Sequence, residues 1–221
     1  MNYSVLPYIT LDIGISPQYS IIWLHGLGAD GEDFVPIAQQ INLPVAVRYL
    51  FPHAPKRPVT INGGMMMRAW YDIIAFGGPV DSAGIQASQA AIENLIAQEK
   101  QRGIVAKNIY LAGFSQGGAV ALHTGLHHAE KLGGIIALSS RLPQAEKLPV
   151  EISAHKPPIF MAHGRSDPII PYSTGSHSAT LLKEGGYQLE WREYDMPHSV
   201  CTEEIGDIEC WLVRQLSNNS V

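Results

Sequence analysis

The sequence predicts an α/β fold in which a mainly parallel central sheet has helices on both faces. Short apolar runs alternate with amphipathic segments along the chain, which is typical of parallel strands buried beneath helices. The 221 residues are 46% hydrophobic and only 16% charged, which suits one domain with a substantial core and is too little for two. We therefore expect residues 1–221 to form a single domain.

Composition and charge exclude several classes of protein. A net charge of −5 argues against nucleic acid as the main partner. No run of about 18 apolar residues occurs, so we expect no integral membrane segment. Residues 1–7 have no basic residue ahead of their apolar part, so we expect no secretory signal.

The two cysteines indicate a reducing compartment. Cys201 and Cys210 are expected on one helix. Nine residues along a helix separate two Cα atoms by about 13 Å, which is too far for a disulfide. Two free thiols suit the cytoplasm, and we expect a cytoplasmic protein.

The first quarter of the chain predicts three strands and a short helix. Apolar and β-branched residues predict strands over 3–11, 20–24 and 45–51. A helix is expected over 34–41, with Asp33 as its N-cap.

A long loop and a long helix are expected next. Residues 56–79 contain two adjacent glycines and three adjacent methionines and predict a loop, which at this length in a compact domain is usually functional. The helix is capped by Asp81 or Ser82 and ends at Gly103. Its apolar face has helical spacing and comprises Ile85, Ser88, Ile92, Leu95 and Ile96.

The second half of the chain continues the alternation of strands and helices. Strands are expected over 134–139, 158–162 and 187–194. Helices are expected over 173–184 and from Thr202 onward.

Between these halves, a serine occupies the sharpest predicted turn. Apolar residues from Ile109 predict a strand, Gly-x-Ser-x-Gly follows at 113–117, and an apolar helical start follows that. In such a strand–turn–helix, Ser115 adopts a strained backbone that pushes its hydroxyl outward. Side chains at 113 or 117 would collide with the neighbouring strand and helix. The alternative is a glycine-rich turn with an incidental serine.

A serine nucleophile needs a base and a third group that orients the base. Ligands of a parallel sheet bind beyond the carboxyl ends of its strands, and two later loops there contain Asp167 and His198. The order Ser115, Asp167, His198 is the chain order of the α/β-hydrolase fold. Asp195 is a rival acid only three residues before His198. Taken alone, Asp167 before a proline is also typical of a turn.

The remaining histidines fit these roles less well. His155 precedes a strand, His163 precedes the acid, and His177 falls in a predicted helix. His123 and His127 are four residues apart on one helix face, as in a metal pair. No Glu lies between them in the zinc-protease pattern and no third ligand is evident, so we expect a solvated helix face instead. The expected reaction needs no metal and no organic cofactor.

The segment His25-Gly26-Leu27-Gly28 follows the second predicted strand, where this fold presents the loop that completes an oxyanion hole. Glycines allow the backbone to approach a substrate and turn an N–H inward. We expect the backbone N–H groups of Leu27 and Gln116 to be the donors, each contributing about 3 kcal/mol in the transition state. The alternative is a plain glycine turn after a strand.

Substrate contacts are expected in the long loop, because no insertion is long enough to form a lid domain. Residues 73–76 are apolar and show no core-strand periodicity, and flexible methionine side chains adapt to varied shapes. The alternative is that 73–76 simply packs on the core. We expect the acyl group to contact Met65, Trp70, Ile73, Ile74 and Phe76.

Together these motifs resemble the acyl-protein thioesterase/carboxylesterase family of α/β hydrolases, also called phospholipase/carboxylesterase. The resemblance implies a triad of Ser115, Asp167 and His198, with Leu27 and Gln116 as oxyanion donors, and it suggests a homodimer. It covers nearly the whole chain and rests on segments 25–29, 51–55, 60–64, 70–72, 111–118, 163–171 and 198–201 and on the closing helix.

The chain departs from this family at one point. Before Leu-Pro, the family tends to have a small or aromatic residue, whereas this chain has Arg141. If Arg141 faces the cleft, substrate preference is expected to differ.

The sequence thus predicts a serine hydrolase that cleaves carboxylic esters and thioesters through an acyl-enzyme. The substrate would be a small-molecule or lipid acyl ester or thioester, or an acylated protein. One alternative is a peptidase-like α/β hydrolase, although such enzymes often have an additional domain or propeller that this chain lacks. A second is a catalytically inactive hydrolase fold used as a binding module, against which the complete Ser-Asp-His set argues.

Overall fold

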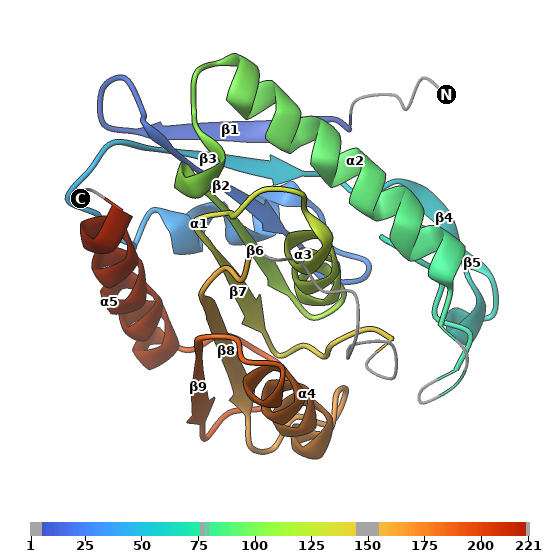
Figure 1. Ribbon diagram of the computed structural model, residues 1–221. Coiled ribbons are helices and arrows are strands. Elements are labelled where there is room, and N and C mark those ends of the chain that lie inside the picture. The colour runs from blue at the N-terminus through green and yellow to red at the C-terminus, as the bar shows by residue number, and fades with distance from the viewer. Residues whose placement is uncertain (1–5, 76–77, 79, 145–154, 220–221) are drawn as a thin grey trace.

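The protein, described here by a computed structural model over residues 6–75, 78, 80–144 and 155–219, is built around a seven-stranded sheet (Figure 1). The strand order is β1-β3-β2-β6-β7-β8-β9, with β1 antiparallel to β3 and the other pairs parallel. This confirms the predicted fold class. The strands are β1 Tyr8–Ile13, β2 Tyr19–Leu24, β3 Val47–Pro52, β6 Ile109–Phe114, β7 Gly134–Leu138, β8 Ile159–Gly164 and β9 Leu189–Tyr194.

Helices cover both faces of the sheet, and each face has its own apolar core. Helices α2, α3 and α4 pack on one face through residues such as Ile92, Leu122 and Leu182. The 3-10 helix η1 and helices α1 and α5 pack on the other, through Phe34 and Trp211 among others. The bounds are η1 Gly31–Phe34, α1 Val35–Ala38, α2 Ser82–Gln101, η3 Ala106–Asn108, α3 Gln116–His127, α4 Tyr172–Glu184 and α5 Thr202–Asn219.

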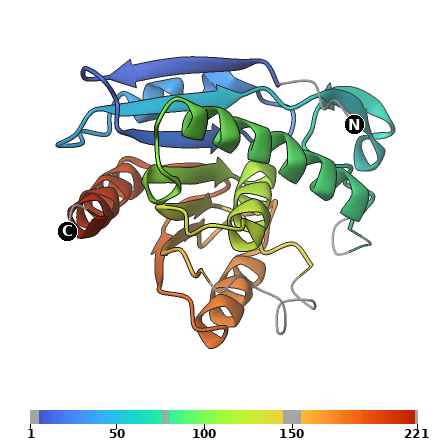
Figure 2. The ribbon, with the colours of Figure 1, turned by 45° about the horizontal axis from the view of Figure 1, so that its top comes forward.

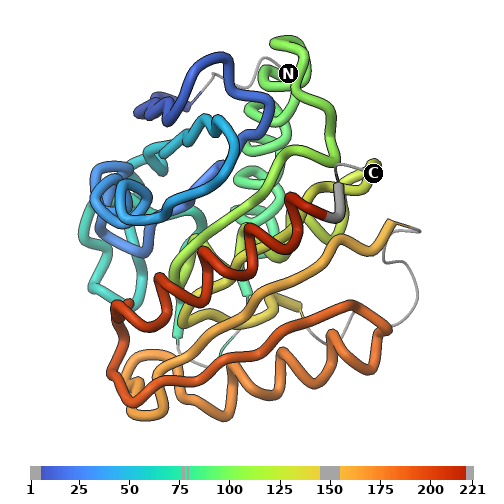
Figure 3. The backbone as a smooth tube through the Cα atoms, turned by 90° about the vertical axis from the view of Figure 1, so that its left-hand side faces the viewer, coloured from blue at the N-terminus to red at the C-terminus, as the bar shows by residue number. Residues whose placement is uncertain are grey.

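The two helical layers are visible from different directions. Figure 2 shows α2 (green), α3 (yellow-green) and α4 (orange) following one another along one side of the sheet, with α5 (red) on the opposite side. Figure 3 looks onto that opposite side, where α5 crosses in front of the strands. Because six of the strands run parallel, the loops after β2, β6, β8 and β9 all lie at one edge of the sheet.

The predicted strands and helices are confirmed with shifts of a few residues, apart from two differences. Residues 3–5 of the first predicted strand lie outside the described residues. The predicted N-cap Asp33 is wrong, because the turn begins earlier. Asp30 is the cap, and its side chain accepts from the Glu32 N–H at 2.9 Å. Asp33 then lies inside η1, and the α-helical part is only four residues long.

The second difference concerns residues 56–79, which do not form one long loop. Strands β4 Lys56–Val59 and β5 Met65–Arg68 pair antiparallel, joined by the 3-10 helix η2 Thr60–Asn62. Gly63 and Gly64 follow with φ of 66° and 78°, a region that favours glycine. The hairpin was not predicted because its Lys, Pro and Met residues lack the β-branched alternation that marks a strand.

Two further expectations concern membrane-spanning helices and the cysteines. No helix among the described residues is both long and apolar enough to cross a membrane. Cys201 just precedes α5 and Cys210 lies within it, and both thiols are free as expected.

Candidate active site

Ser115 occupies the turn between β6 and α3 in a strained backbone conformation. Its φ of 54° and ψ of −118° lie in a region that costs a non-glycine residue about 1–3 kcal/mol. A Cβ on Gly113 would lie 2.4 Å from the backbone of Gly117, and one on Gly117 would lie 2.4 Å from the carbonyl oxygen of Leu24. Both predicted collisions are therefore present, and they explain why the turn requires glycine at 113 and 117.

Neighbouring strands hold the strained turn in place. The Ser115 N–H donates to the carbonyl of Leu138 at 2.8 Å, at the end of β7. The Ser140 hydroxyl donates to the carbonyl oxygen of Ser115 at 2.8 Å. These bonds stabilise a conformation that the local sequence alone would disfavour.

Asp167 and His198 lie together beyond the ends of β8 and β9. Asp167 Oδ2 is 2.7 Å from His198 Nδ1, and the Asp167 side chain is fully buried. Ser115 and His198 line the same cavity, and the His198 ring packs on Phe114 with 4.7 Å between ring centroids. The structure thus brings the three residues predicted from the sequence to one place.

The Asp167 carboxylate is held by more than His198. Its Oδ1 accepts from the backbone N–H groups of Ile169 and Ile170 at 2.8 and 2.9 Å. His163 Nε2 lies 3.3 Å from Oδ2 and 2.8 Å from the Ile170 carbonyl oxygen. Burial lowers the pKa of His163, which favours its neutral form. His163 is thus a neighbour of the acid that sequence order alone did not reveal.

The rival acid Asp195 has different surroundings. Its side chain is exposed, and its charge acts on Arg165. Among the described contacts, the carboxylate bound to His198 is that of Asp167.

Leu27 and Gln116 both line the cavity beside Ser115. We find no acceptor for either backbone N–H within the described part of the chain. For Gln116 this follows from its place as the first residue of α3, where an N–H has no intrahelical partner. Both N–H groups are therefore available to a ligand in the cavity.

The buried ring of His25 fixes the peptide that contains the Leu27 N–H. His25 Nε2 accepts from the Ala54 N–H at 3.0 Å, so Nδ1 has the proton and donates to the Gly26 carbonyl at 2.7 Å. Burial lowers the pKa of His25 to about 4, which keeps the ring neutral. Because the Gly26 carbonyl and the Leu27 N–H belong to one peptide unit, orienting the first orients the second.

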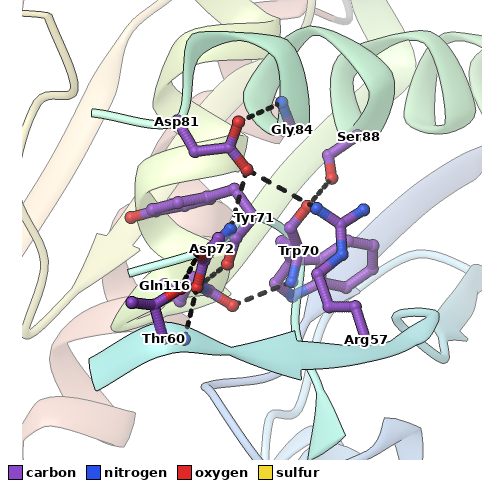
Figure 4. A network of polar contacts seen from close by, with 9 residues as sticks. All are labelled: Arg57, Thr60, Trp70, Tyr71, Asp72, Asp81, Gly84, Ser88 and Gln116. Atoms are coloured by element: carbon purple, nitrogen blue, oxygen red, sulfur yellow. Dashed lines mark hydrogen bonds and ion pairs between the residues drawn. The ribbon is translucent and has the colours of Figure 1, made fainter. Parts of the chain in front are cut away.

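A network of hydrogen bonds connects Gln116, the residue after Ser115, to the segment that precedes α2, as Figure 4 shows. Gln116 Oε1 accepts from the Trp70 N–H and its Nε2 donates to the Tyr71 carbonyl, both at 2.8 Å. The Ser88 hydroxyl of α2 donates to the Trp70 carbonyl oxygen. Asp81 caps α2 through the Gly84 N–H, as the sequence predicted, and also accepts from the Asp72 N–H at 2.9 Å.

The cavity beside Ser115 has a volume of about 600 Å³ and a largely apolar lining. This volume suits a small ligand or part of a larger one. Its lining comprises Gly26, Leu27, Ala29, Asp33, Ile61, Asn62, Tyr71, Ile73, Ala75, Phe114, Ser115, Gln116, Ala119, Arg141, Ile169, Ile170, Pro171, Thr174 and His198.

Of the five expected substrate contacts, the structure brings one to this cavity. Ile73 lines it. Trp70 is fully buried and its indole N–H donates to the His25 carbonyl, so it supports the site instead. Met65 and Ile74 are exposed and do not line the cavity. Phe76 lies outside the described residues.

The sequence reasoning missed most of the lining. Residues 61–62 of the hairpin turn and 169–171 after Asp167 reach the cavity from loops whose side-chain directions depend on tertiary packing. The one available signal was the apolar pair Ile169-Ile170 directly after the predicted acid.

His123 and His127 do not form part of a metal site in the described residues, where no group of three or more potential ligands occurs. Their rings are tilted by 36° with centroids 4.3 Å apart, and His123 Nε2 lies 3.1 Å from Gln89 Oε1. The expected solvated face is wrong for His123, which is buried, whereas His127 is exposed. Burial lowers the pKa of His123 to about 4.

Known proteins resemble this chain over most of its length. The family model described as phospholipase/carboxylesterase matches residues 15–215. Acyl-protein thioesterase 1 of Neurospora crassa is 42% identical over 212 residues, covering 89% of this chain and 86% of that protein. Carboxylesterase SOBER1 of Arabidopsis thaliana is 34% identical over 209 residues, covering 90% and 92%. The crystal structure of SOBER1 superposes with a TM-score of 0.84 at 32% identity, covering 90% of this chain and 99% of that chain.

These matches extend across both halves of the sheet and include every segment that forms the cavity. They agree with the fold class and with the resemblance that the motifs indicated. The chain therefore belongs to the phospholipase/carboxylesterase family of α/β hydrolases and is an enzyme of the esterase and thioesterase class.

Proposed function

We propose that the protein hydrolyses carboxylic esters and thioesters through an acyl-enzyme formed on Ser115. The observation on which this rests is the 2.7 Å contact between Asp167 and His198 beside a strained serine on the same cavity. An acid, a base and a nucleophile that faces the substrate cavity are what acyl transfer requires.

In the first half of the reaction, Ser115 Oγ attacks the acyl carbon while His198 Nε2 takes the hydroxyl proton. His198 returns that proton to the leaving alcohol or thiol as the tetrahedral intermediate collapses. Asp167 holds the imidazole in the tautomer with the proton on Nδ1 and stabilises the imidazolium that forms. A water molecule then repeats the sequence on the acyl-enzyme and releases the acid.

The negative charge on the acyl oxygen is stabilised by two backbone donors. The N–H groups of Leu27 and Gln116 are available in the cavity, and each contributes about 3 kcal/mol when it faces the developing oxyanion. The hydrogen bonds of His25 and of the Gln116 side chain fix these two peptides before substrate binds. No metal or organic cofactor takes part in these steps.

The lining supports an apolar acyl group as part of the substrate. Ile73, Ile169 and Ile170 give the cavity apolar walls next to the serine. Small-molecule esters, lipid esters and acylated proteins all present such a group, and the relatives named as acyl-protein thioesterases make thioesters a natural second class.

Replacing Ser115 by alanine tests the mechanism. Ser115→Ala should lower kcat by about 10⁶-fold, because the chemical step loses its nucleophile. Alanine is smaller than serine and fits the same turn, so thermal unfolding should show a folded protein. Retention of more than a few per cent of the wild-type esterase activity would contradict the proposal.

A fluorophosphonate probe separates an active hydrolase from a catalytically inactive binding module. The wild type should be labelled covalently at Ser115, which intact-protein and peptide mass spectrometry would locate. Ser115→Ala should not react. A peptidase-like specificity would appear as cleavage of peptide amides at rates comparable with esters.

We further propose that the protein is cytoplasmic and forms a homodimer. The two free thiols suit a reducing cytoplasm. The homodimer suggested by the resemblance would be tested by sedimentation equilibrium.

A further inference from the structure

Arg141, which follows two buried serines after β7, lines the cavity. Among the described lining residues it is the only lysine or arginine, and most of its neighbours there are apolar. A guanidinium on an apolar wall beside a candidate nucleophile is expensive to desolvate unless it has an anionic partner.

The backbone on both sides of Arg141 is fixed. The Ser139 N–H donates to the Ala162 carbonyl at 2.8 Å, and the Ser140 hydroxyl donates to the Ser115 carbonyl at 2.8 Å. On the other side, the Leu142 N–H donates to Ser178 Oγ at 3.0 Å. Ser140 and Leu142 are buried. Arg141 is therefore held at a defined distance from the nucleophile and is not on a loose surface loop.

The described contacts of Arg141 leave its charge uncompensated. Burial raises the pKa of the Tyr71 hydroxyl, and the positive charge of Arg141 and its hydrogen bond with this hydroxyl oppose that rise. Figure 4 shows the phenol of Tyr71 projecting away from the Asp81 network, so this hydroxyl is not used there. No ion pair among the described residues involves Arg141.

The other arginines behave differently. All of them except Arg68 lie within 4.0 Å of a carboxylate, and Arg68 donates to the Ala54 carbonyl at 2.9 Å. Among the described residues that line the cavity, Asp33 is the only one with a carboxyl group. It makes no ion pair with Arg141 among the described contacts.

We propose that the cavity takes esters or thioesters that have a second, anionic group, with the Arg141 guanidinium as its counter-ion. A carboxylate or phosphate fits, because the planar guanidinium binds either in a bidentate manner. The inference rests on the proposed esterase and thioesterase function and specifies its substrate class. The anion belongs either to the acyl group or to the leaving group.

Two pairs of matched substrates separate these sources. For the acyl side, mono-4-nitrophenyl glutarate is compared with 4-nitrophenyl 5-methylhexanoate, in which two methyl groups replace the carboxylate oxygens. For the leaving-group side, the pentanoyl thioester of 3-mercaptopropionate is compared with that of 3-methylbutane-1-thiol. The readout is the ratio of kcat/KM between the anionic and the neutral member of each pair, measured for each variant.

Arg141→Gln should lower this ratio by roughly tenfold to a hundredfold in one of the two pairs, which identifies the side that bears the anion. Arg141→Lys keeps the charge and should retain most of the ratio. Arg214→Gln is the control, because it removes the same charge from an exposed arginine of α5 that pairs with Glu190. It should leave both ratios as they are in the wild type.

A ratio that stays within about twofold of wild type for Arg141→Gln in both pairs would overturn the inference. Should Arg141→Gln fail to fold, the wild-type ratio still tests it, because an ion pair weakens as salt rises and the ratio should fall between 0.05 and 0.5 M salt by several-fold. A ratio independent of salt would count against it. Turnover of the neutral ester by the wild type reports on the proposed function separately, since it does not involve the anion.

Discussion

The side-chain amide of Gln116 bonds to two consecutive residues of a different segment: it accepts from the Trp70 N–H and donates to the Tyr71 carbonyl, both at 2.8 Å. Both bonds are buried, and Gln116 directly follows the candidate nucleophile. One residue thus contributes a backbone donor to the cavity and anchors that donor through its own side chain.

Gln116→Leu should therefore lower activity and stability together. It leaves the Trp70 N–H and the Tyr71 carbonyl without partners, which destabilises the fold by about 2–4 kcal/mol. A displaced Gln116 N–H should also lower kcat by about tenfold to a hundredfold. Steady-state kinetics and urea unfolding measure the two effects. Lower stability with unchanged kcat would mean that the side chain supports the fold alone.

The two candidate acids give a second prediction. Asp167→Asn should lower kcat by about 10⁴-fold, because the amide favours the wrong tautomer of His198. Asp195→Asn should change kcat by less than about threefold, because Asp195 is exposed and its charge acts on Arg165. The reverse ranking would move the acid to Asp195.

Neighbouring isoleucines provide a matched test of the acyl wall. Ile73 lines the cavity, whereas Ile74 is 45% exposed and does not. Each bound methylene contributes about 0.8 kcal/mol, so two extra carbons should raise kcat/KM about tenfold in the wild type. Ile73→Ser should flatten this chain-length profile, and Ile74→Ser should preserve it. Parallel losses at every chain length for Ile73→Ser would assign it a structural role.

The buried carboxyl of Glu204 gives a prediction about pH. Glu204 is 0% exposed, and burial raises its pKa from 4.5 to about 8. The folded protein thus keeps a proton that the unfolded chain releases, so this group's contribution to stability is present below pH 4.5 and is lost as the pH rises toward 8.

Glu204→Gln removes this titration. At pH 7 it should raise the free energy of unfolding by roughly 3 kcal/mol relative to wild type, and the difference should vanish near pH 4. Glu203→Gln is the control, because Glu203 is exposed one residue earlier in the same helical turn. Urea unfolding at several pH values measures both. A pH-independent difference for Glu204→Gln would show that folding does not raise the pKa of this carboxyl.

The sequence was most informative where backbone geometry restricts the residue type. The turn at 113–117 accepts only glycine at positions 113 and 117, because a Cβ at either position would collide with backbone atoms. The residues after parallel strands converge by topology, so Asp167 and His198 could be placed by chain order alone.

Side-chain direction in loops could not be predicted in the same way. Trp70 and Met65 were expected to contact the acyl group, yet one is buried beneath the site and the other is 63% exposed on a hairpin. The position of Met65 follows from the pairing of β4 with β5, and that of Trp70 from its hydrogen bond with Gln116. The Trp70 bond joins residues that are distant in sequence. Asp30 caps η1 in place of Asp33 because the first helical turn begins at Gly31, three residues before the predicted start.

The positions of the three candidate residues have a consequence for synthesis of the chain. They follow β6, β8 and β9, and β9 is an edge strand and the last strand in the described part of the chain. Domains generally acquire structure while the chain emerges at about 5–20 residues per second, so the N-terminal strands can pair well before His198 exists. With the proposed triad, turnover should appear only after β9 has docked on the sheet, whereas the circular dichroism signal of the helices should appear earlier.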